Sequence, residues 1–231
     1  MDKTLEIGTP PLKITLRRSA RARRFSLRVS RADGAVILSL PRWAPEREAL
    51  AFARSQESWI RRAQAARPVM MPLALGGVIP IGGALLRIEA GAGAGVRCEG
   101  ETLVVPANAA ALPGPRIEAF VKLLARHRLA GACDGYAALV GRPHAGLTLR
   151  DTRSRWGSCS AAGKLMFSWR LAMAPPEVLD YVAAHEVAHL VEMNHAPAFW
   201  SVVRSLMPDY QQHRDWLKQN GATLQAIRFR H

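Results

Sequence analysis

Three histidines between residues 185 and 195 constrain the fold of this chain more than any other feature of its sequence. His185 and His189 are four residues apart, and a helix of about 3.6 residues per turn places such a pair on one face, where both imidazoles can hold one metal ion. Glu186 then lies beside the ion. A zinc hydrolase needs this arrangement, because a carboxylate next to the metal can take a proton from the attacking water and later return it.

Catalytic zinc usually has three protein ligands and one open position, so a third ligand is expected, and His195 is the candidate. A straight helix would carry His195 away from the ion, so the chain must turn after His189. We expect Asn194 to make that turn in the left-handed conformation, and Pro197 to prevent the helix from continuing. A single helical histidine is more often structural, but three at ligand spacing beside a glutamate favour metal binding.

The residues around the metal helix predict the rest of a catalytic half. Pro175 and Pro176 mark the start of the metal helix. Before it we predict a long amphipathic helix over 116–140 that backs the metal helix, then a hairpin of strands over 147–151 and 164–171. This order suits a zincin-like α+β fold. A strand edge beside the metal would let an extended peptide bind by strand addition.

The segment after the metal helix predicts a further helix from Pro197. Phe199 and Trp200 on this helix are expected in the core. Tyr210 and His213 follow, and either could donate a hydrogen bond to an oxyanion, although a packed aromatic and a surface histidine are the commoner roles for these residue types.

Several short motifs accompany the histidine helix: Arg155-Trp156-Gly157-Ser158-Cys159-Ser160, Trp169-Arg170-Leu171, Ala174-Pro175, Leu179-Asp180-Tyr181-Val182, Asn194-His195, Phe199-Trp200 and Met207-Pro208-Asp209-Tyr210. Together they resemble the YgjP-like family of metal-dependent hydrolases, relatives of the SprT-like and WLM zinc peptidases of the minigluzincin type. The resemblance is dense from Arg150 to Leu217. It implies zinc as the cofactor, His185, His189 and His195 as its ligands, and Glu186 as the general base. Ser168 departs from the pattern, which would have asparagine there.

The N-terminal part reads as β-rich and basic. Apolar residues alternate over 12–40, which predicts a β-hairpin turning at Asp33-Gly34. One face of this hairpin carries a set of arginines: Arg17, Arg18, Arg21, Arg23, Arg24, Arg28 and Arg31. Such a density could contact the phosphates of a nucleic acid, although few aromatics accompany it to stack on bases. A solvated sheet face with a flexible loop explains the same pattern.

A run of alanine and proline over 107–115 is the predicted domain boundary. Residues 1–106 would form a β-rich region containing the basic hairpin, one helix over 45–66 and four strands over 78–81, 85–90, 96–98 and 103–105. Residues 107–231 would form the zincin-like metallohydrolase domain.

Composition limits the setting in which the protein works. Its 231 residues, 49% of them hydrophobic, are enough for a sizeable core. The 32 Lys and Arg against 18 Asp and Glu, a formal +14 spread along the chain, favour anionic partners or a solubilising use of arginine. No apolar run reaches the roughly 18 residues of a membrane span, and residues 1–16 lack signal-peptide features, so we expect a soluble cytoplasmic protein without a membrane partner. Three scattered cysteines agree with a reducing compartment.

The leading hypothesis is a zinc-dependent hydrolase of peptidase type that cuts a protein or peptide. A metal-dependent nucleotide phosphohydrolase of the pyrophosphatase type stays open, because water activated by a metal can also attack phosphorus. A nucleic-acid-binding module with structural zinc is the third alternative, and it is disfavoured because no nearby residue closes the fourth position.

Overall fold

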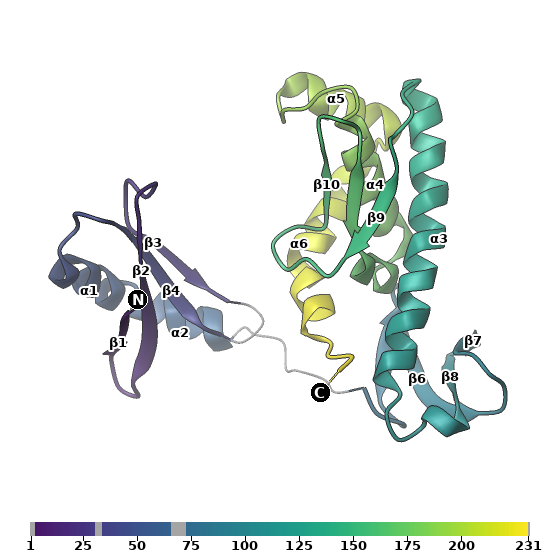
Figure 1. The fold of residues 1–231 in the computed structure, drawn as a ribbon, viewed down its shortest axis with the longest axis horizontal. Helices are drawn as coiled ribbons and strands as arrows, with labels where there is room; N and C mark the ends of the chain where they lie inside the picture. Colours follow the sequence, from purple (N-terminus) through teal and green to yellow (C-terminus); the bar gives the residue numbers. More distant parts are fainter. Residues whose placement is uncertain (1–2, 31–33, 66–72, 231) are drawn as a thin grey trace. The chain divides into compact units, whose positions relative to one another are not determined.

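The computed structural model describes residues 3–30, 34–65 and 73–230. The chain divides into two compact units, Met1–Val69 and Met70–His231, whose elements are labelled in Figure 1. This division differs from the predicted boundary at 107–115. The reason is a shared core: Ile79, Ile88 and Leu103, from the strands that precede the alanine-proline run, are buried in one cluster with Ile117 and Val121 from the helix that follows it.

The Met1–Val69 unit contains a four-stranded sheet in the order β1-β2-β4-β3. Its strands are β1 (Lys3–Ile7), β2 (Leu12–Ser19), β3 (Ser26–Val29) and β4 (Val36–Pro41). The predicted hairpin is confirmed for β3 and β4, which are antiparallel, and Gly34 in their connection has φ 73°. β2 is instead parallel to β4, and it pairs with β1, a strand that was not predicted. The Asp33 part of the expected turn and Arg31 lie outside the described residues.

Two helices, α1 (Glu46–Ser55) and α2 (Glu57–Ala65), replace the single helix predicted over 45–66. The first helix ends at Gln56, whose backbone angles, φ −101° and ψ 7°, leave the helical region. Ala49, Ala53 and Ile60 are buried in one cluster with the apolar residues of the sheet. Trp59 of α2 is 42% exposed.

The Met70–His231 unit begins with a second four-stranded sheet in the order β5-β6-β8-β7. The strands are β5 (Val78–Ile81), β6 (Ala84–Gly91), β7 (Arg97–Glu99) and β8 (Thr102–Pro106). All four were predicted from the glycine-punctuated pattern of this region. A short 3-10 turn, η1 (Ala107–Ala109), leads to the long helix α3 (Gly114–Val140), which ends as predicted at Gly141 with φ 65°.

The elements around the histidines follow α3. They are β9 (Leu147–Arg150), β10 (Gly157–Cys159), β11 (Leu165–Ser168), the 3-10 turn η2 (Trp169–Met173), α4 (Pro176–Ala188), α5 (Pro197–Leu206) and α6 (Tyr210–Ala226). The predicted hairpin paired the wrong strands. β9 is parallel to β11, and the antiparallel partner of β11 is β10, across a turn in which Gly163 has φ 69°.

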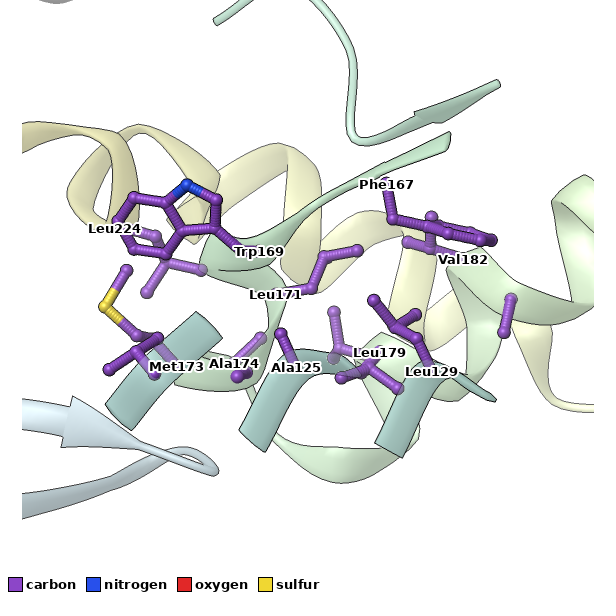
Figure 2. Packing of buried hydrophobic residues seen from close by; sticks show 14 of the residues in the cluster. Ala125, Leu129, Phe167, Trp169, Leu171, Met173, Ala174, Leu179, Val182 and Leu224 are labelled. Carbon is purple, nitrogen blue, oxygen red and sulfur yellow. The ribbon is translucent and has the colours of Figure 1, made fainter. Parts of the chain in front are cut away.

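Figure 2 shows how the core holds α4 in place. Leu171 and Ala174, on η2 and just after it, are packed in one cluster with Leu129 of α3 and with Leu179 and Val182 of α4. The expectation that the long helix backs the metal helix is confirmed, since α3 packs along α4. α4 is therefore buried on nearly all sides, which makes it a rigid support for the side chains it carries.

Arg170 ties the C-terminal segment to this core. Its guanidinium donates from Nη1 to the carbonyl oxygens of Leu224 and Ile227, at 2.9 Å each, and from Nε to Oδ1 of Asp151 at 2.6 Å. The mixed helices and sheets give an α+β fold with a β-rich N-terminal region, as predicted. Among the described helices, none has the length and apolar content needed to cross a bilayer.

Candidate metal centre

The three predicted ligands come together in the structure. The ligand nitrogens of His185, His189 and His195 all lie within 4.8 Å of one another. Nε2 of His185 and Nε2 of His195 are 3.1 Å apart. In a tetrahedral zinc site with Zn–N distances of about 2.0–2.1 Å, neighbouring nitrogens are about 3.3 Å apart, so this spacing fits a shared metal ion.

The chain reaches His195 by a route that differs from the prediction. α4 ends at Ala188, and the next residues form tight turns in which the Leu190 N–H donates to Val187 O at 2.9 Å and the Glu192 N–H donates to Ala188 O at 3.0 Å. Asn194 does not adopt the left-handed conformation. Its side-chain Oδ1 instead accepts a hydrogen bond from the Ala196 N–H at 3.0 Å, a local turn that α5 then follows.

Phe199 of α5 forms an apolar floor under the cluster. Its ring centroid lies 4.9 Å from that of His185, 4.4 Å from that of His189 and 4.7 Å from that of His195. The ring centroid of Trp200 lies 5.8 Å from those of both His185 and His195. The prediction that Phe199 is a core residue is confirmed, because its side chain is fully buried. Its contact with all three imidazoles was not foreseen, since spacing along a helix does not show which rings meet across helices.

Hydrogen bonding and packing orient the imidazoles differently. Nδ1 of His189 lies 2.9 Å from Glu192 O, and a proton on Nδ1 leaves the Nε2 lone pair for a metal ion. Nδ1 of His185 is buried without a hydrogen-bond partner among the described residues. The orientation of His185 therefore depends on the rings of Tyr181 and Phe199 that pack edge-on against it.

Burial keeps the histidines in the form that binds metal. Desolvation, followed by the charges of His189, His195 and Arg214, lowers the pKa of His185 to about 3. Desolvation also lowers the pKa of His189, although its hydrogen bond to the Glu192 carbonyl acts in the opposite direction. Metal ligation requires a neutral imidazole, so these two side chains are ready to bind at neutral pH.

Glu186 lies against the edge strand β10 and is only 6% exposed. The absence of a side chain at Gly157 makes this position possible: a Cβ there would be 2.6 Å from both Cγ and Oε1 of Glu186. Burial raises the pKa of Glu186 to about 8, against the lowering effects of a hydrogen bond with the Cys159 backbone and of the Arg155 charge. The site thus combines three imidazoles, two of them kept neutral by burial, with a buried carboxyl group.

The two other residues named from the sequence have partners of their own. Tyr210 is buried and stacks between Trp200, at 5.5 Å, and Tyr181, at 6.3 Å. His213 was expected at the surface, but its side chain is 12% exposed and its Nε2 lies 3.2 Å from Oδ2 of Asp209. The guanidinium of Arg214, which the sequence reading did not single out, lies 4.9 Å from the Trp200 ring centroid and brings a positive charge near the cluster.

A separate groove of about 730 Å³ runs between α3 and the start of α4. Gly131, Gly135, Arg128 and Asp180 are among the residues that line it. Neither Glu186 nor the histidine cluster lines this groove, so it does not extend the metal centre.

The family of the chain is shown by comparison with known proteins. The family model described as YgjP-like, metallopeptidase domain, matches residues 23–220. This is most of the sequence, and the chain belongs to the YgjP-like family. The metallopeptidase domain of this family, together with the three-histidine cluster, supports a metal-dependent hydrolase.

Among solved structures, the chain is similar to the metallopeptidase zymogen of Pyrococcus abyssi abylysin, with 18% sequence identity and a TM-score of 0.36. The matched region covers 39% of this chain and 93% of that one. The comparison with curated proteins found no match.

Proposed function

We propose that this protein is a zinc-dependent metallopeptidase in which His185, His189 and His195 hold the metal and Glu186 is the general base. The observation that carries the proposal is the convergence of three imidazoles next to one buried carboxyl group. A donor set of three imidazole nitrogens suits zinc, and it leaves a fourth position open for water or substrate.

Each residue has a distinct task in this proposal. Zinc, when bound, supplies a Lewis acid that polarises the scissile carbonyl and makes water more acidic. Glu186 accepts a proton from the attacking water and delivers it to the leaving nitrogen. The Cys159 backbone and Gly157 hold the carboxyl group in position against β10.

The edge of β10 supports a peptide as the substrate. Among the described strands, β10 is at the edge of the sheet ordered β10-β11-β9 and pairs with β11 alone. The Ser160 N–H donates to Lys164 O, and Trp156 O accepts from the Ser168 N–H, so the backbone groups of these residues face β11. Because the bonding direction alternates along an antiparallel strand, Gly157 and Cys159 turn their backbone groups toward the free edge, on the side where Glu186 lies. An extended peptide could pair with this edge and bring a main-chain carbonyl to the metal.

Replacing Glu186 by glutamine tests the chemistry. Glutamine keeps the size of the side chain but removes the base, so zinc should stay bound while hydrolysis of an unfolded protein substrate falls by roughly two to four decades. Parent and variant are assayed in parallel on the protein substrate and on nucleoside triphosphates, with and without a chelator. Chelator-sensitive hydrolysis of triphosphates that needs Glu186, without any proteolysis, would replace this proposal by the phosphohydrolase alternative.

Replacing His195 by alanine tests the third ligand. Elemental analysis of the purified parent should give close to one zinc per chain, and the variant should lose most of this zinc in competition with a chelator. His127→Ala is the matched control, because His127 is exposed on α3 and belongs to no histidine cluster. Equal zinc retention by the His195 and His127 variants would show that the ligand assignment is wrong.

A further inference from the structure

The positive charge of the chain is concentrated in the Met1–Val69 unit. This unit holds 15 Lys and Arg against 6 Asp and Glu, a formal +9 of the chain's +14. The excess of positive charge is therefore uneven, whereas the sequence had been interpreted as carrying it along the whole chain. Between Ile7 and Ser30 there is no acidic residue at all. A surface of this kind attracts polyanions.

Two loops leave the sheet of this unit at the same end. Arg18 pairs with Leu40 and Ser19 pairs with Pro41 in the parallel register of β2 and β4, so both strands end side by side. The segment over 20–25, which we call the arginine loop, leaves from β2. The segment over 42–44, the Trp43 turn, leaves from β4. Figure 1 shows these strand ends in the sheet of the N-terminal unit.

The Trp43 turn presents an aromatic ring that the sequence reading had not singled out. Trp43 is 77% exposed. The turn itself is held firmly, because Nη1 of Arg18 donates to Arg42 O at 2.8 Å and to Ala44 O at 2.9 Å, and Ala44 is buried. An indole exposed on a tightly held turn loses little conformational entropy when a flat partner stacks on it.

The arginine loop supplies charges that the fold does not use. Arg21, Arg23 and Arg24 are exposed, and their side chains make no ion pair or hydrogen bond with the described residues. The loop is anchored at its far end, where Phe25 stacks on Phe52 of α1 with ring centroids 5.5 Å apart. The three guanidinium groups thus belong to a loop that leaves the sheet at the same end as the Trp43 turn, and they remain available to a ligand.

We propose that this end of the Met1–Val69 unit binds single-stranded nucleic acid, with Trp43 stacking on a base and Arg21, Arg23 and Arg24 contacting phosphates. A single strand is the ligand that combines exposed base faces with a closely spaced row of phosphates, whereas a duplex keeps its base faces stacked. An anionic membrane is a poorer match, because α1 and α2 turn their buried residues toward the sheet and leave no apolar helix face for lipid.

The test measures binding of the full-length protein to fluorescein-labelled oligothymidylate and oligouridylate over a series of KCl concentrations. The parent should bind one or both, more weakly as salt rises. Replacing Arg21, Arg23 and Arg24 together by glutamine should reduce the slope of log affinity against log salt by about 2, since each phosphate contact contributes about 0.7. Trp43→Ala should weaken binding about 5- to 150-fold with the slope kept, and Trp43→Phe should restore most of the loss. The two oligomers show whether DNA or RNA is preferred.

Two matched variants control for nonspecific effects. Trp59→Ala removes another partly exposed tryptophan of the same unit, from α2, and should bind like the parent. Replacing Arg126, Arg142 and Arg204 by glutamine removes the same charge from exposed positions in the other unit, and should leave the slope unchanged. Thermal melting of each variant confirms that the fold is retained.

The proposal is overturned if the parent binds neither oligomer, or if the control triple flattens the slope as much as the arginine-loop triple. It is equally overturned if Trp43→Ala binds like the parent, or if duplex DNA binds as tightly as the single strands, since either result would mean a nonspecific basic surface. Preferential binding to vesicles of anionic lipid would make this end of the unit a membrane contact instead.

Discussion

Replacing Gly157 by alanine is expected to disable catalysis while leaving the metal site intact. A Cβ at this position would lie 2.6 Å from Cγ and Oε1 of Glu186 and 2.8 Å from Cδ. Ordinary contacts begin near 3.4 Å, so Glu186 or β10 must move by the difference, about 0.8 Å. A displacement of about this size in a catalytic group costs on the order of 100-fold in rate, and the overpacking costs about 1–3 kcal/mol of stability.

The experiment compares three quantities for parent and variant: kcat/KM on a protein substrate, zinc content and the urea unfolding midpoint. Zinc content should not change, because the nearest atoms to the added methyl group all belong to Glu186. Gly131→Ala on α3 is the matched control. Apart from the neighbouring backbone of α3 itself, no described atom lies within 4 Å of a Cβ at this position, so the variant should keep full activity and gain about 1 kcal/mol of helix stability. Parent-like activity of Gly157→Ala would refute the argument that catalysis depends on Glu186 being held against β10.

Three further changes have defined outcomes. In the metal-free protein, burial raises the pKa of Glu186 from its ordinary 4.5 to about 8. The protonated carboxyl group therefore stabilises the fold fully below pH 4.5, and this stabilisation, at most about 5 kcal/mol, is lost as the pH rises through 8. In urea unfolding with chelator, the stability of Glu186→Gln relative to the parent should increase across that pH range, and parallel pH profiles would contradict this. Phe199→Leu removes the ring under the imidazoles and should weaken zinc binding about tenfold in a chelator competition. Val203→Ala, a change on the same buried face of α5, is the control and should leave zinc binding unchanged. Ser168→Ala removes a buried hydroxyl that has no hydrogen-bond partner among the described residues, so it should raise the thermal unfolding midpoint, by roughly 1 kcal/mol in stability, at unchanged activity. A lower midpoint would mean that the hydroxyl is hydrogen-bonded in solution.

Elements with a strong local signal were predictable from the sequence. α4 begins at Pro176 and α3 ends at Gly141, as expected, because a proline in the first turn and a glycine after the last turn act within a few residues. The four strands from Val78 to Pro106 were also found, since glycines separate short apolar runs. The prediction of one helix over 45–66 missed the break at Gln56, because the apolar periodicity continues across it.

Strand pairing was decided by tertiary structure. Alternating apolar residues define which face of a strand is buried, but they do not determine its neighbour. The hairpin predicted over 12–40 took in the residues of β2 without naming their neighbour, and Leu16 of β2 lies beside Leu38 of β4 in parallel register. β9 was expected to form a hairpin with β11, and it is parallel to that strand instead. In both cases the observed partner comes from packing of the whole sheet, which no local pattern contains.

In the candidate site, too, the sequence determined some features and only the tertiary structure decided others. The sequence by itself determined the pair His185 and His189 with Glu186 between them, because helix geometry alone places residues four apart on one face. It also predicted His195 as the third ligand, but not the path to it, which depends on turns that Asn194 was wrongly expected to make. Only the tertiary structure could place Phe199 under all three imidazoles, Gly157 against Glu186, and the free edge of β10 beside them. Those contacts join elements far apart in the chain, and their formation depends on how the helices and strands pack together.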